Sequence, residues 1–255
     1  MVTLKSPAEL DRMREAGRLV ARVLEAVRAA ARPGTALKEL DALAADLIAE
    51  AGAESSFLGY RPAFADTPYP AVLCTSLNDV ILHGVPDSTP LRDGDVLSVD
   101  FGAAVGGYHG DAARTFTVGE GDAAAHRLIE ATERAYRAAL PHMVPGARLG
   151  DVSHAIESAA RETGYGQPEG HGGHGIGTAM HEDPHLSNTG RPGRGMRLRE
   201  GLVLAIEPQL TEGGGDGWRL LADGWSVATD DGSRAAHHEN TVAVTADGPL
   251  VLTEP

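Results

Sequence analysis

Apolar and polar residues alternate along the first part of the chain with the period of a helix. Apolar side chains recur at three- and four-residue steps from Leu10 to Val27, which is the spacing of one helix face. Ser6 and Glu9 have the spacing of a capping box, and Pro7 suits the first helical position. We therefore expect a helix that begins at Pro7 and ends at the break Arg32-Pro33-Gly34.

A second helical pattern follows, and the sequence repeats it once further along the chain. Thr35 begins the first copy and Gly52 closes it. The signature Pro-Gly-x-x-Leu-x-x-Leu/Val, closed by Glu-x-Gly, occurs at residues 33–52 and 145–164, 112 positions apart. Each copy follows a long predicted helix, the second of which covers about residues 122–140. Coincidence between two helix starts is one explanation, and one α/β unit used twice is the explanation that we favour.

Short apolar runs bounded by turn residues predict strands in both halves of the chain. The pair Gly106-Gly107 has the composition of a hairpin turn. Helices and strands together indicate an α+β fold, and we expect one domain over residues 1–255 with pseudo-twofold halves at about 7–120 and 121–252. The predicted strands are Ala71–Thr75, Val80–His83, Asp95–Phe101, Thr115–Val118, Leu202–Ile206, Trp225–Ala228 and Asn240–Val244.

The composition argues against several classes of protein. The net charge of −14 disfavours a nucleic-acid partner, which a basic surface would bind. No stretch approaches the roughly 18 to 20 apolar residues of a membrane helix, and the first residues lack the apolar segment of a signal peptide. The one cysteine, Cys74, excludes an internal disulfide and fits a reducing compartment. We expect a cytoplasmic protein without membrane or nucleic-acid partners, with a monomer as the default state.

Five residues with metal-binding side chains stand in five separate short motifs. A buried carboxylate is costly without a positive partner, and the apolar runs VLSVDFG and LVLAIEP contain no Lys or Arg. Two divalent cations would supply that partner. Each residue alone could simply cap a turn, but the five together indicate a dinuclear metallohydrolase. They are Asp100 in SVDFG, Asp111 in YHGDAART, His174 in GGHGIG, Glu207 in AIEPQL and Glu239 in HHENT.

These five residues divide between the two predicted halves of the chain. Asp100 and Asp111 come from the first half, and the other three come from the second. Asp100 and Glu207 each end an apolar run, whereas Glu239 directly precedes one. A site assembled between two halves lies in a cleft, where ligand sites usually occur. We therefore expect the metal site at the junction of the halves.

The motifs of this chain resemble those of one known family. The stretches NDVILHGVP, SVDFG, HGDAART, GGHGIG, MHEDPH, AIEPQL, DGWSV and HHENTVAVT are similar, in order and spacing, to those of type I methionine aminopeptidases, and the resemblance runs from Pro7 to Leu252. It implies the pita-bread fold, in which duplicated α/β halves surround a curved antiparallel sheet. It also implies a bacterial enzyme that removes the initiator methionine from nascent polypeptides and from peptides.

The resemblance assigns a role to each predicted ligand. Asp111 and Glu239 match the residues that bridge two metal ions. Asp100 matches a ligand of one ion, whereas His174 and Glu207 match ligands of the other. It implies that a hydroxide held between the ions attacks the first peptide carbonyl, and that Glu207 passes the proton to the leaving nitrogen. Co²⁺, Mn²⁺ or Fe²⁺ suit such a carboxylate-rich site, and the sequence does not distinguish them.

Two further histidines match active-site histidines of the family that bind no metal. By this resemblance, His181 would hydrogen-bond the substrate carbonyl or the oxyanion, and His83 would contact the substrate near the scissile bond. The alternatives are a core histidine satisfied by backbone for His83, and a loop residue or further metal ligand for His181. The resemblance also points to an apolar pocket for the methionine side chain, formed by Tyr60, Tyr69, Cys74, Met180 and Trp225.

The chain departs from the family pattern at three places. The loop from Tyr60 to Tyr69 is longer than the common short form, which puts the pocket roles of both tyrosines in question. Met180 stands where an aromatic residue is usual, which would widen the pocket. An N-terminal extension with zinc-binding cysteines is missing. Ribosome attachment through such a module is therefore not implied, although a transient ribosome contact remains open.

Other functions remain open from the sequence. A proline-specific peptidase of the same fold would cut Xaa-Pro bonds, but such relatives usually carry a large N-terminal domain, and this chain starts directly at the catalytic unit. A non-catalytic binding protein of this fold would have lost ligands, whereas all five positions are filled. The HExxH pattern at residues 181–185 imitates the helix of a zinc protease, but Pro184 would break that helix.

Overall fold

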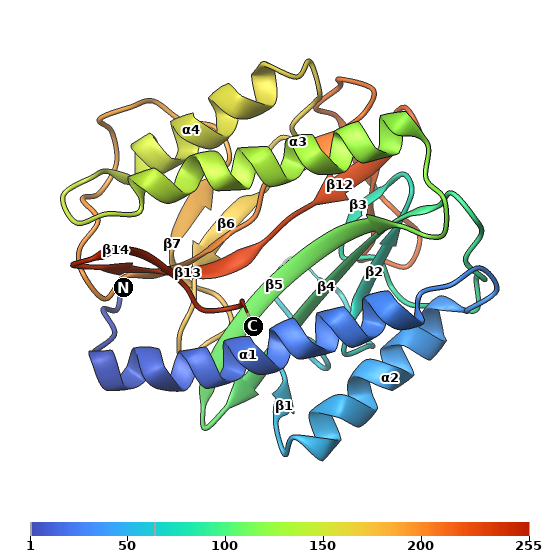
Figure 1. Ribbon diagram of the computed structural model, residues 1–255, viewed down its shortest axis with the longest axis horizontal. Coiled ribbons are helices and arrows are strands. Elements are labelled where there is room, and N and C mark those ends of the chain that lie inside the picture. The colour runs from blue at the N-terminus through green and yellow to red at the C-terminus, as the bar shows by residue number, and fades with distance from the viewer. Residues whose placement is uncertain (1, 64, 255) are drawn as a thin grey trace.

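The computed structural model of the chain describes residues 2–63 and 65–254, and four α-helices lie in those ranges (Figure 1). The first three predicted helices are confirmed to within a few residues, and the second copy of the repeated pattern contains the fourth. The helices are α1 (Pro7–Ala30), α2 (Leu37–Glu50), α3 (Ala123–Ala139) and α4 (Leu149–Arg161), and a 3₁₀ turn at Leu140–His142 follows α3.

Side-chain caps explain where α1 and α3 begin. The carboxylate of Glu9 accepts hydrogen bonds from the backbone N–H of Ser6 at 2.8 Å and from the Ser6 hydroxyl at 2.7 Å. These hydrogen bonds lower the pKa of Glu9 to about 2. At α3, the Ala125 N–H donates to the side chain of Asp122 at 2.7 Å. Both caps satisfy backbone amides at or beside a helix start.

The first half of the chain forms an antiparallel sheet around the long hairpin β4–β5, with β1 and β2 paired to β4. Gly106 and Gly107 form its turn with φ values of 57° and 80°. Glycine adopts such positive values without strain, and the predicted hairpin turn is confirmed. β5 begins well before the predicted Thr115. The strands are β1 (Glu54–Ser55), β2 (Cys74–Leu77), β3 (Val80–Leu82), β4 (Val96–Val105) and β5 (Tyr108–Thr117).

The second half forms a five-stranded antiparallel sheet in the order β14-β13-β8-β6-β7. In two smaller sheets, β12 pairs with β9, and β11 pairs with both β10 and β3 of the first half. The apolar pattern predicts β8, β11 and β13 but misses the others. The strands are β6 (Gly172–Gly175), β7 (Glu182–Ser187), β8 (Val203–Ile206), β9 (Gln209–Thr211), β10 (Trp218–Leu220), β11 (Val227–Thr229), β12 (Ala235–His237), β13 (Asn240–Thr245) and β14 (Gly248–Val251).

Glycines allow β6 to lie between β7 and β8. A Cβ atom on Gly173 would lie 2.0 Å from the carbonyl oxygen of Ala205, and one on Gly175 would lie 2.3 Å from that of Asp183. Such contacts are far inside van der Waals distance, so the neighbouring backbones approach closely only because both positions lack a side chain. The glycines around His174 therefore serve the packing of three strands against one another.

The two helix pairs cover different parts of the sheets. In Figure 1, α1 and α2 lie on one side of the β4–β5 hairpin, and α3 and α4 lie beyond β13 on the other side. The two halves meet where β5 passes β13. The Thr241 hydroxyl accepts a hydrogen bond from the Asp111 N–H at 3.0 Å and donates one to the Asp111 carbonyl at 2.9 Å. The origin of the halves by duplication stays a prediction.

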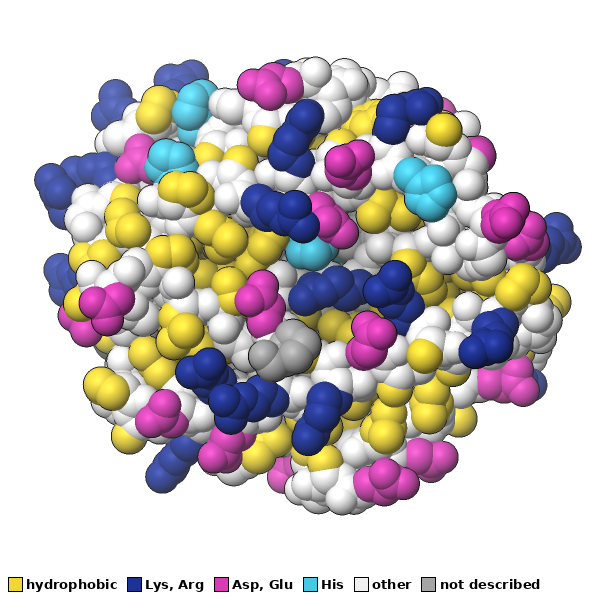
Figure 2. All heavy atoms as spheres, in the orientation of Figure 1, with side chains coloured by type: hydrophobic (Ala, Val, Ile, Leu, Met, Phe, Trp, Pro, Cys, Tyr) yellow, Lys and Arg dark blue, Asp and Glu magenta, His cyan; other side chains and the backbone are white. Residues whose placement is uncertain are grey.

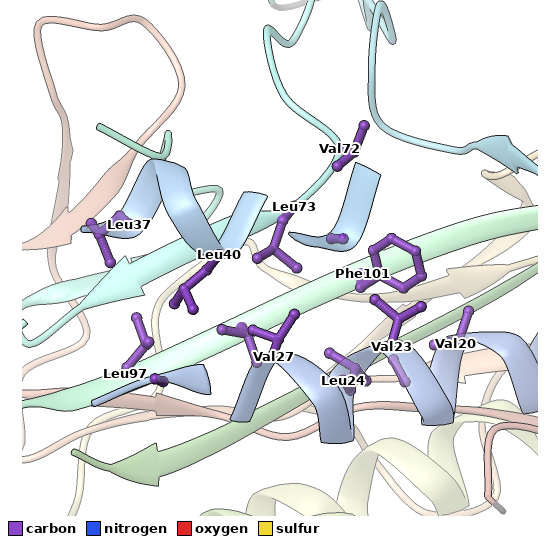
Figure 3. Packing of buried hydrophobic residues seen from close by; sticks show 14 of the residues in the cluster. Val20, Val23, Leu24, Val27, Leu37, Leu40, Val72, Leu73, Leu97 and Phe101 are labelled. Atoms are coloured by element: carbon purple, nitrogen blue, oxygen red, sulfur yellow. The ribbon is translucent and has the colours of Figure 1, made fainter. Parts of the chain in front are cut away.

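An apolar core between α1, α2 and β4 fixes the position of the first-half strands (Figure 3). Phe101 is fully buried in this core. Each fully buried Val or Leu side chain contributes about 1.5–3 kcal/mol of transfer free energy. Since successive side chains of a strand point to opposite faces, burying Phe101 directs its neighbour Asp100 to the other face. The core side chains drawn with Phe101 include Val20, Val23, Leu24, Val27, Leu37, Leu40 and Leu97.

On the face that Figure 2 shows, acidic and basic side chains are interspersed, so neither charge forms a large patch there. Among the described residues, no helix is both long enough and apolar enough to cross a membrane.

The HExxH pattern does not lie on a helix. Its first histidine, His181, directly precedes β7, and His185 lies within that strand, opposite His174 of β6. The two histidines therefore do not share a helix face, and the zinc-protease interpretation is excluded, as Pro184 predicts.

Candidate active site

One cavity of about 220 Å³ brings together all of the residues that the sequence singled out for chemistry. We call five of them the acidic cluster, namely Asp100, Asp111, His174, Glu207 and Glu239. We call another five the apolar wall, namely Tyr60, Tyr69, Cys74, Met180 and Trp225. His83, His181, Phe57 and Pro62 also line the cavity. Pockets for drug-sized ligands measure about 300–1,000 Å³, so this one has the size for a single side chain.

Strand register places the two aspartates of the acidic cluster on one face of the β4–β5 hairpin. Asp100 pairs with Ala113, and Asp111 pairs with Gly102. Positions two apart on a strand share a face, so the two carboxylates lie diagonally across the ladder. A Cβ atom on Gly102 would lie 3.2 Å from Asp111 Oδ1. The glycine therefore leaves room for the Asp111 carboxylate between the strands.

His174 and Glu207 enter the site from adjacent strands of the second half. His174 of β6 pairs with Ala205 of β8, and Glu207 directly follows β8. His174 Nδ1 lies 2.9 Å from the Gly175 carbonyl oxygen, so this nitrogen carries the proton and donates it. The other ring nitrogen, Nε2, is free to bind a metal, and it lies 3.7 Å from both Asp111 Oδ2 and Glu207 Oε1.

Amide side chains hold the Glu207 carboxylate in place. The Gln209 Nε2 donates to Glu207 Oε2 at 2.9 Å, and the Asn188 Nδ2 donates to Gln209 Oε1 at 3.0 Å. Gln209 and Asn188 are themselves buried. Such a chain of outer hydrogen bonds orients a ligand carboxylate and limits its rotamers.

Glu239 lies at the seam between the two halves, next to the first residue of β13. Its backbone N–H donates to the Ala113 carbonyl at 3.0 Å. Arg114 donates to the backbone carbonyl of Glu239 at 2.5 Å and to the Asn240 side chain at 2.7 Å. The guanidinium is thereby engaged by the backbone of Glu239 rather than by its carboxylate.

The carboxylates of the cluster are destabilised in their charged form. Burial, followed by the charges of neighbouring carboxylates, raises the pKa values of Asp100 and Glu239 well above the usual range. Burial also raises the pKa of Glu207, to about 8, although the nearby His174 opposes the shift. Burial lowers the pKa of His174, but Asp111 and Glu207 outweigh it and the pKa rises overall. The metal-free cluster therefore holds protons near neutral pH.

The described residues leave several atoms of this cluster without partners. Asp100 Oδ1, Asp111 Oδ1 and Glu239 Oε1 are buried and accept no hydrogen bond. Within the described ranges, the only basic side chains within 4.0 Å of the cluster's carboxylates are those of two histidines, His174 and His237. Buried polar atoms without partners are rare and need an explanation. Bound cations would provide one.

The spacing of the cluster fits two ions. Two groups of three residues each place one ligand atom per residue within 4.8 Å of the others, namely Asp111, His174 and Glu239, and Asp100, His237 and Glu239. Ligand atoms at about 2.0–2.2 Å from one ion lie roughly 3–4 Å from each other. The two groups share Glu239, which is the arrangement expected of a carboxylate that bridges two metals.

His237 is a residue near the cluster that the sequence motifs did not reveal. This residue ends β12, is 2% exposed, and lies two positions before Glu239. Burial lowers the pKa of His237 to about 4, which leaves the ring neutral. The missed signal is the strand period, because side chains two positions apart on extended backbone face the same way. A histidine two residues from a predicted ligand was therefore a candidate for the same site.

The apolar wall is fixed by its own hydrogen bonds and ring contacts. The Tyr69 hydroxyl donates to the Gly84 carbonyl at 2.9 Å, and the Trp225 Nε1 donates to the Thr67 carbonyl at 3.2 Å. The rings of Tyr69 and Trp225 meet edge to face at 5.1 Å between centroids, a favourable aromatic geometry. Both of these side chains are at least 95% buried.

The long loop brings both of its tyrosines to the cavity. The Tyr69 N–H donates to the Tyr60 carbonyl at 2.8 Å, and the Gly59 N–H donates to the Tyr69 carbonyl at 2.9 Å. These bonds close the loop at its base, and Tyr60 and Tyr69 both line the cavity. The extra length of the loop therefore does not carry either tyrosine away from the site. Phe64, within the loop, lies outside the described residues.

Cys74 and Met180 complete the wall beside the acidic cluster. Cys74 of β2 pairs with Asp100 of β4, so its side chain shares a face with that carboxylate. Burial raises the pKa of the Cys74 thiol well above its usual range. A thiol that stays protonated is a poor nucleophile, which agrees with a packing role. Met180 is 5% exposed and packs with Cys74 and Trp225 in one apolar cluster.

His181 and His83 both line the cavity. The His181 ring stacks on the ring of Tyr60, with 5.0 Å between centroids, and lies tilted against the ring of His174, with 4.1 Å between centroids. His83 has a φ of 56° and meets Trp225 edge to face at 6.3 Å. A histidine at positive φ costs of order 1–3 kcal/mol, and such strain clusters at functional sites. Burial lowers the pKa of His83 to about 3, so this ring is neutral.

The model of metallopeptidase family M24 matches residues 11–246 of the chain. Methionine aminopeptidase 1 of Mycobacterium tuberculosis is 50% identical over 260 residues, which cover 99% of this chain and 95% of that protein. Methionine aminopeptidase 1 of Bacillus subtilis is 41% identical over 253 residues, with 99% of each chain covered.

Solved structures show the same fold. The crystal structure of methionine aminopeptidase from Thermotoga maritima superimposes with a TM-score of 0.95 at 37% identity and covers the whole of both chains. A prolidase from Pyrococcus horikoshii is similar at a TM-score of 0.79 and 22% identity, and the match covers 98% of this chain but 63% of that one. The similarity to the prolidase shows the pita-bread fold alone, whereas the similarity to the Thermotoga maritima structure extends over the full length of both chains. The predicted fold is confirmed.

Proposed function

The chain belongs to metallopeptidase family M24, and from that premise we propose that it is an aminopeptidase that removes the N-terminal methionine from nascent proteins and peptides. One observation carries the proposal: an acidic cluster with orphaned buried atoms and a closed apolar wall line the same small cavity. The full-length similarity to methionine aminopeptidases supports the same activity.

Two divalent cations would be held by the five side chains of the acidic cluster. Asp111 and Glu239 would bridge them, Asp100 would bind one ion, and His174 and Glu207 would bind the other. When bound, the ions neutralise the carboxylates and supply a water molecule with a lowered pKa as the nucleophile. Carboxylate and imidazole donors suit Mn²⁺, Fe²⁺ or Co²⁺.

Glu207 and His181 would manage the proton and the developing charge. Glu207 would take up the proton of the attacking water and return it to the leaving nitrogen. His181 lies against His174 at the edge of the cluster, where its ring would donate to the carbonyl oxygen as negative charge develops. His83, neutral and strained, would position the substrate backbone beside Trp225.

The apolar wall would select the first side chain of the substrate. Its aromatic and sulfur-containing side chains favour contact with a flexible thioether. The cavity of about 220 Å³ has room for one such side chain, so a small second residue would be preferred. Met180 and Cys74 place sulfur atoms beside the rings of Tyr69 and Trp225.

We further propose a cytoplasmic location, a monomeric state and, at most, a transient contact with the ribosome. The free, buried Cys74 fits a reducing compartment, and nascent polypeptides are the natural source of initiator methionine.

A hydrolysis assay tests the proposal against its rivals. Purified protein loaded with Co²⁺ or Mn²⁺ is expected to release methionine from Met-Ala-Ser but not from its N-acetylated form, and to leave Ala-Pro intact. Cleavage of Ala-Pro with no cleavage of Met-Ala-Ser would favour an Xaa-Pro peptidase. Metal binding without any hydrolysis would favour a non-catalytic binding protein. The shared fold with a prolidase motivates the first rival.

A further inference from the structure

A second imidazole, that of His237, lies beside the carboxylates of the acidic cluster. His237 pairs with Gln209 across the β12–β9 ladder, and its side chain is 2% exposed. The Nε2 atom of its ring is buried and has no hydrogen-bond partner among the residues that the structure describes. An unpartnered ring nitrogen at such a depth requires a partner of some kind.

The neighbours of this nitrogen are ligand oxygens. His237 Nε2 lies 3.6 Å from Glu239 Oε2 and 3.6 Å from Glu207 Oε2. A separation of 3.6 Å is too long for a hydrogen bond. The distance to Glu239 Oε2 does fit two donor atoms that share one ion, because such atoms lie roughly 3–4 Å apart when each bond is about 2.0–2.2 Å.

Each of the two three-residue groups that could hold an ion contains one histidine. Asp111, His174 and Glu239 form one group, and Asp100, His237 and Glu239 form the other. From this geometry we propose that His237 Nε2 is a ligand of the ion held by Asp100 and Glu239, so that each ion receives one imidazole. The inference rests on the proposed metal pair and adds a sixth side chain to it.

The added nitrogen changes the chemistry of the site. An all-carboxylate position suits hard ions such as Mn²⁺, whereas an imidazole shifts the preference toward Fe²⁺, Co²⁺ or Zn²⁺. The rival explanation is that the ring donates a hydrogen bond to a ligand carboxylate after a small shift. In that case His237 would support Glu239 or Glu207 but would not touch an ion.

X-ray absorption of the protein loaded with two equivalents of Co²⁺ separates these explanations. The inference expects an average of one imidazole per cobalt in the parent protein and one half in His237→Gln. Calorimetry of that variant is expected to show at least about a tenfold loss of affinity for one of the two ions. Both explanations predict this loss, so the imidazole count decides between them. The matched control is His238→Gln, since the ring of His238 packs against that of Tyr136 with 4.8 Å between centroids. This variant should keep the imidazole count and the metal affinities of the parent protein.

An imidazole count of one half in the parent protein, or a count in His237→Gln that equals that of the parent, would overturn the inference. If His237→Gln does not fold, His181→Ala decides. If the imidazole count per cobalt in His181→Ala stays at one, His181 is not the second imidazole ligand. If that count falls to one half, His181 is the ligand. Release of methionine from Met-Ala-Ser by the parent protein tests the proposed function independently of all these outcomes.

Discussion

The two sides of the cavity are stabilised in different ways. The apolar wall is complete in the protein alone, since the polar atoms of Tyr69 and Trp225 are hydrogen-bonded and their rings pack on one another. The acidic cluster is incomplete, since Asp100, Asp111 and Glu239 each have a buried oxygen without a partner. The wall therefore owes its shape to folding, whereas the cluster needs cations to reach its stable state.

This difference separates selection from chemistry within one cavity. A rigid apolar surface can recognise a side chain without any cofactor. A group of buried carboxyls with raised pKa values gives up protons when an ion binds, and the ion then neutralises the carboxylates. Changes in the wall should thus affect substrate affinity and fold stability, and changes in the cluster should affect metal binding and turnover.

Glu239→Ala should produce the largest effect. It removes the shared carboxylate, so turnover of Met-Ala-Ser should fall by about 10³-fold or more and metal content should fall with it. The metal-free variant should be at least as stable as the metal-free parent, because one unpartnered buried carboxyl group is gone. Elemental analysis, kinetics and thermal unfolding measure the three quantities. The exposed Glu200→Ala is the control, and retention of both ions in Glu239→Ala would contradict the bridging role.

His181→Ala should lower kcat by about 10²–10³-fold, the typical effect of losing one donor to a developing oxyanion. Its metal content should match that of the parent protein, since His181 touches the ring of His174 but belongs to neither three-residue group. Steady-state kinetics and elemental analysis check this pair of outcomes. Loss of metal would mean that His181 is a ligand.

Metal affinity should rise with pH through 8, because carboxyl groups of the cluster must lose protons before they bind an ion. Folding raises the pKa of Glu207 from 4.5 to about 8, so below pH 8 the metal-free protein must release a proton to bind an ion. The same shift means that the folded state binds more protons than the unfolded state between pH 4.5 and 8. The metal-free protein should therefore lose stability as pH rises through that window. Calorimetry in two buffers counts the released protons, and an affinity that does not change with pH would refute the shift.

Trp225→Ala should destabilise the protein by about 3–5 kcal/mol, because a large buried ring is removed. It should also raise KM for Met-Ala-Ser while the protein still binds metal. Chemical denaturation and kinetics provide the measurements, with the exposed Trp218→Ala as the matched control. A loss of metal from Trp225→Ala would show that the wall and the cluster are not independent.

Met180→Leu should have the smallest effect. The exchange conserves volume and should cost less than about 1.5 kcal/mol of stability. Metal binding should stay unchanged, and KM for Met-Ala-Ser should change by a few-fold at most. A large fall in kcat with unchanged KM would instead indicate that Met180 influences the reacting groups.

The comparison also explains which parts of the fold were predictable. The helices follow from local patterns, since apolar spacing and caps such as Asp122 act within a few residues. The β4–β5 hairpin turn follows from Gly106-Gly107 for the same reason. β6 was not predictable, because its Gly-Gly-His-Gly sequence has no strand preference of its own and becomes a strand through pairing with β7 and β8.

The five-residue acidic cluster could be proposed from the chain alone, because buried carboxylates without basic neighbours in sequence require cations, and the motifs resemble one family. The order of residues does not record which atoms face one another across strands. The closure of the long loop that keeps Tyr60 at the cavity, and the approach of His237 to Glu207 and Glu239, depend on pairings between distant segments. Those contacts exist only after the strands align, and for that reason the tertiary structure alone decided them.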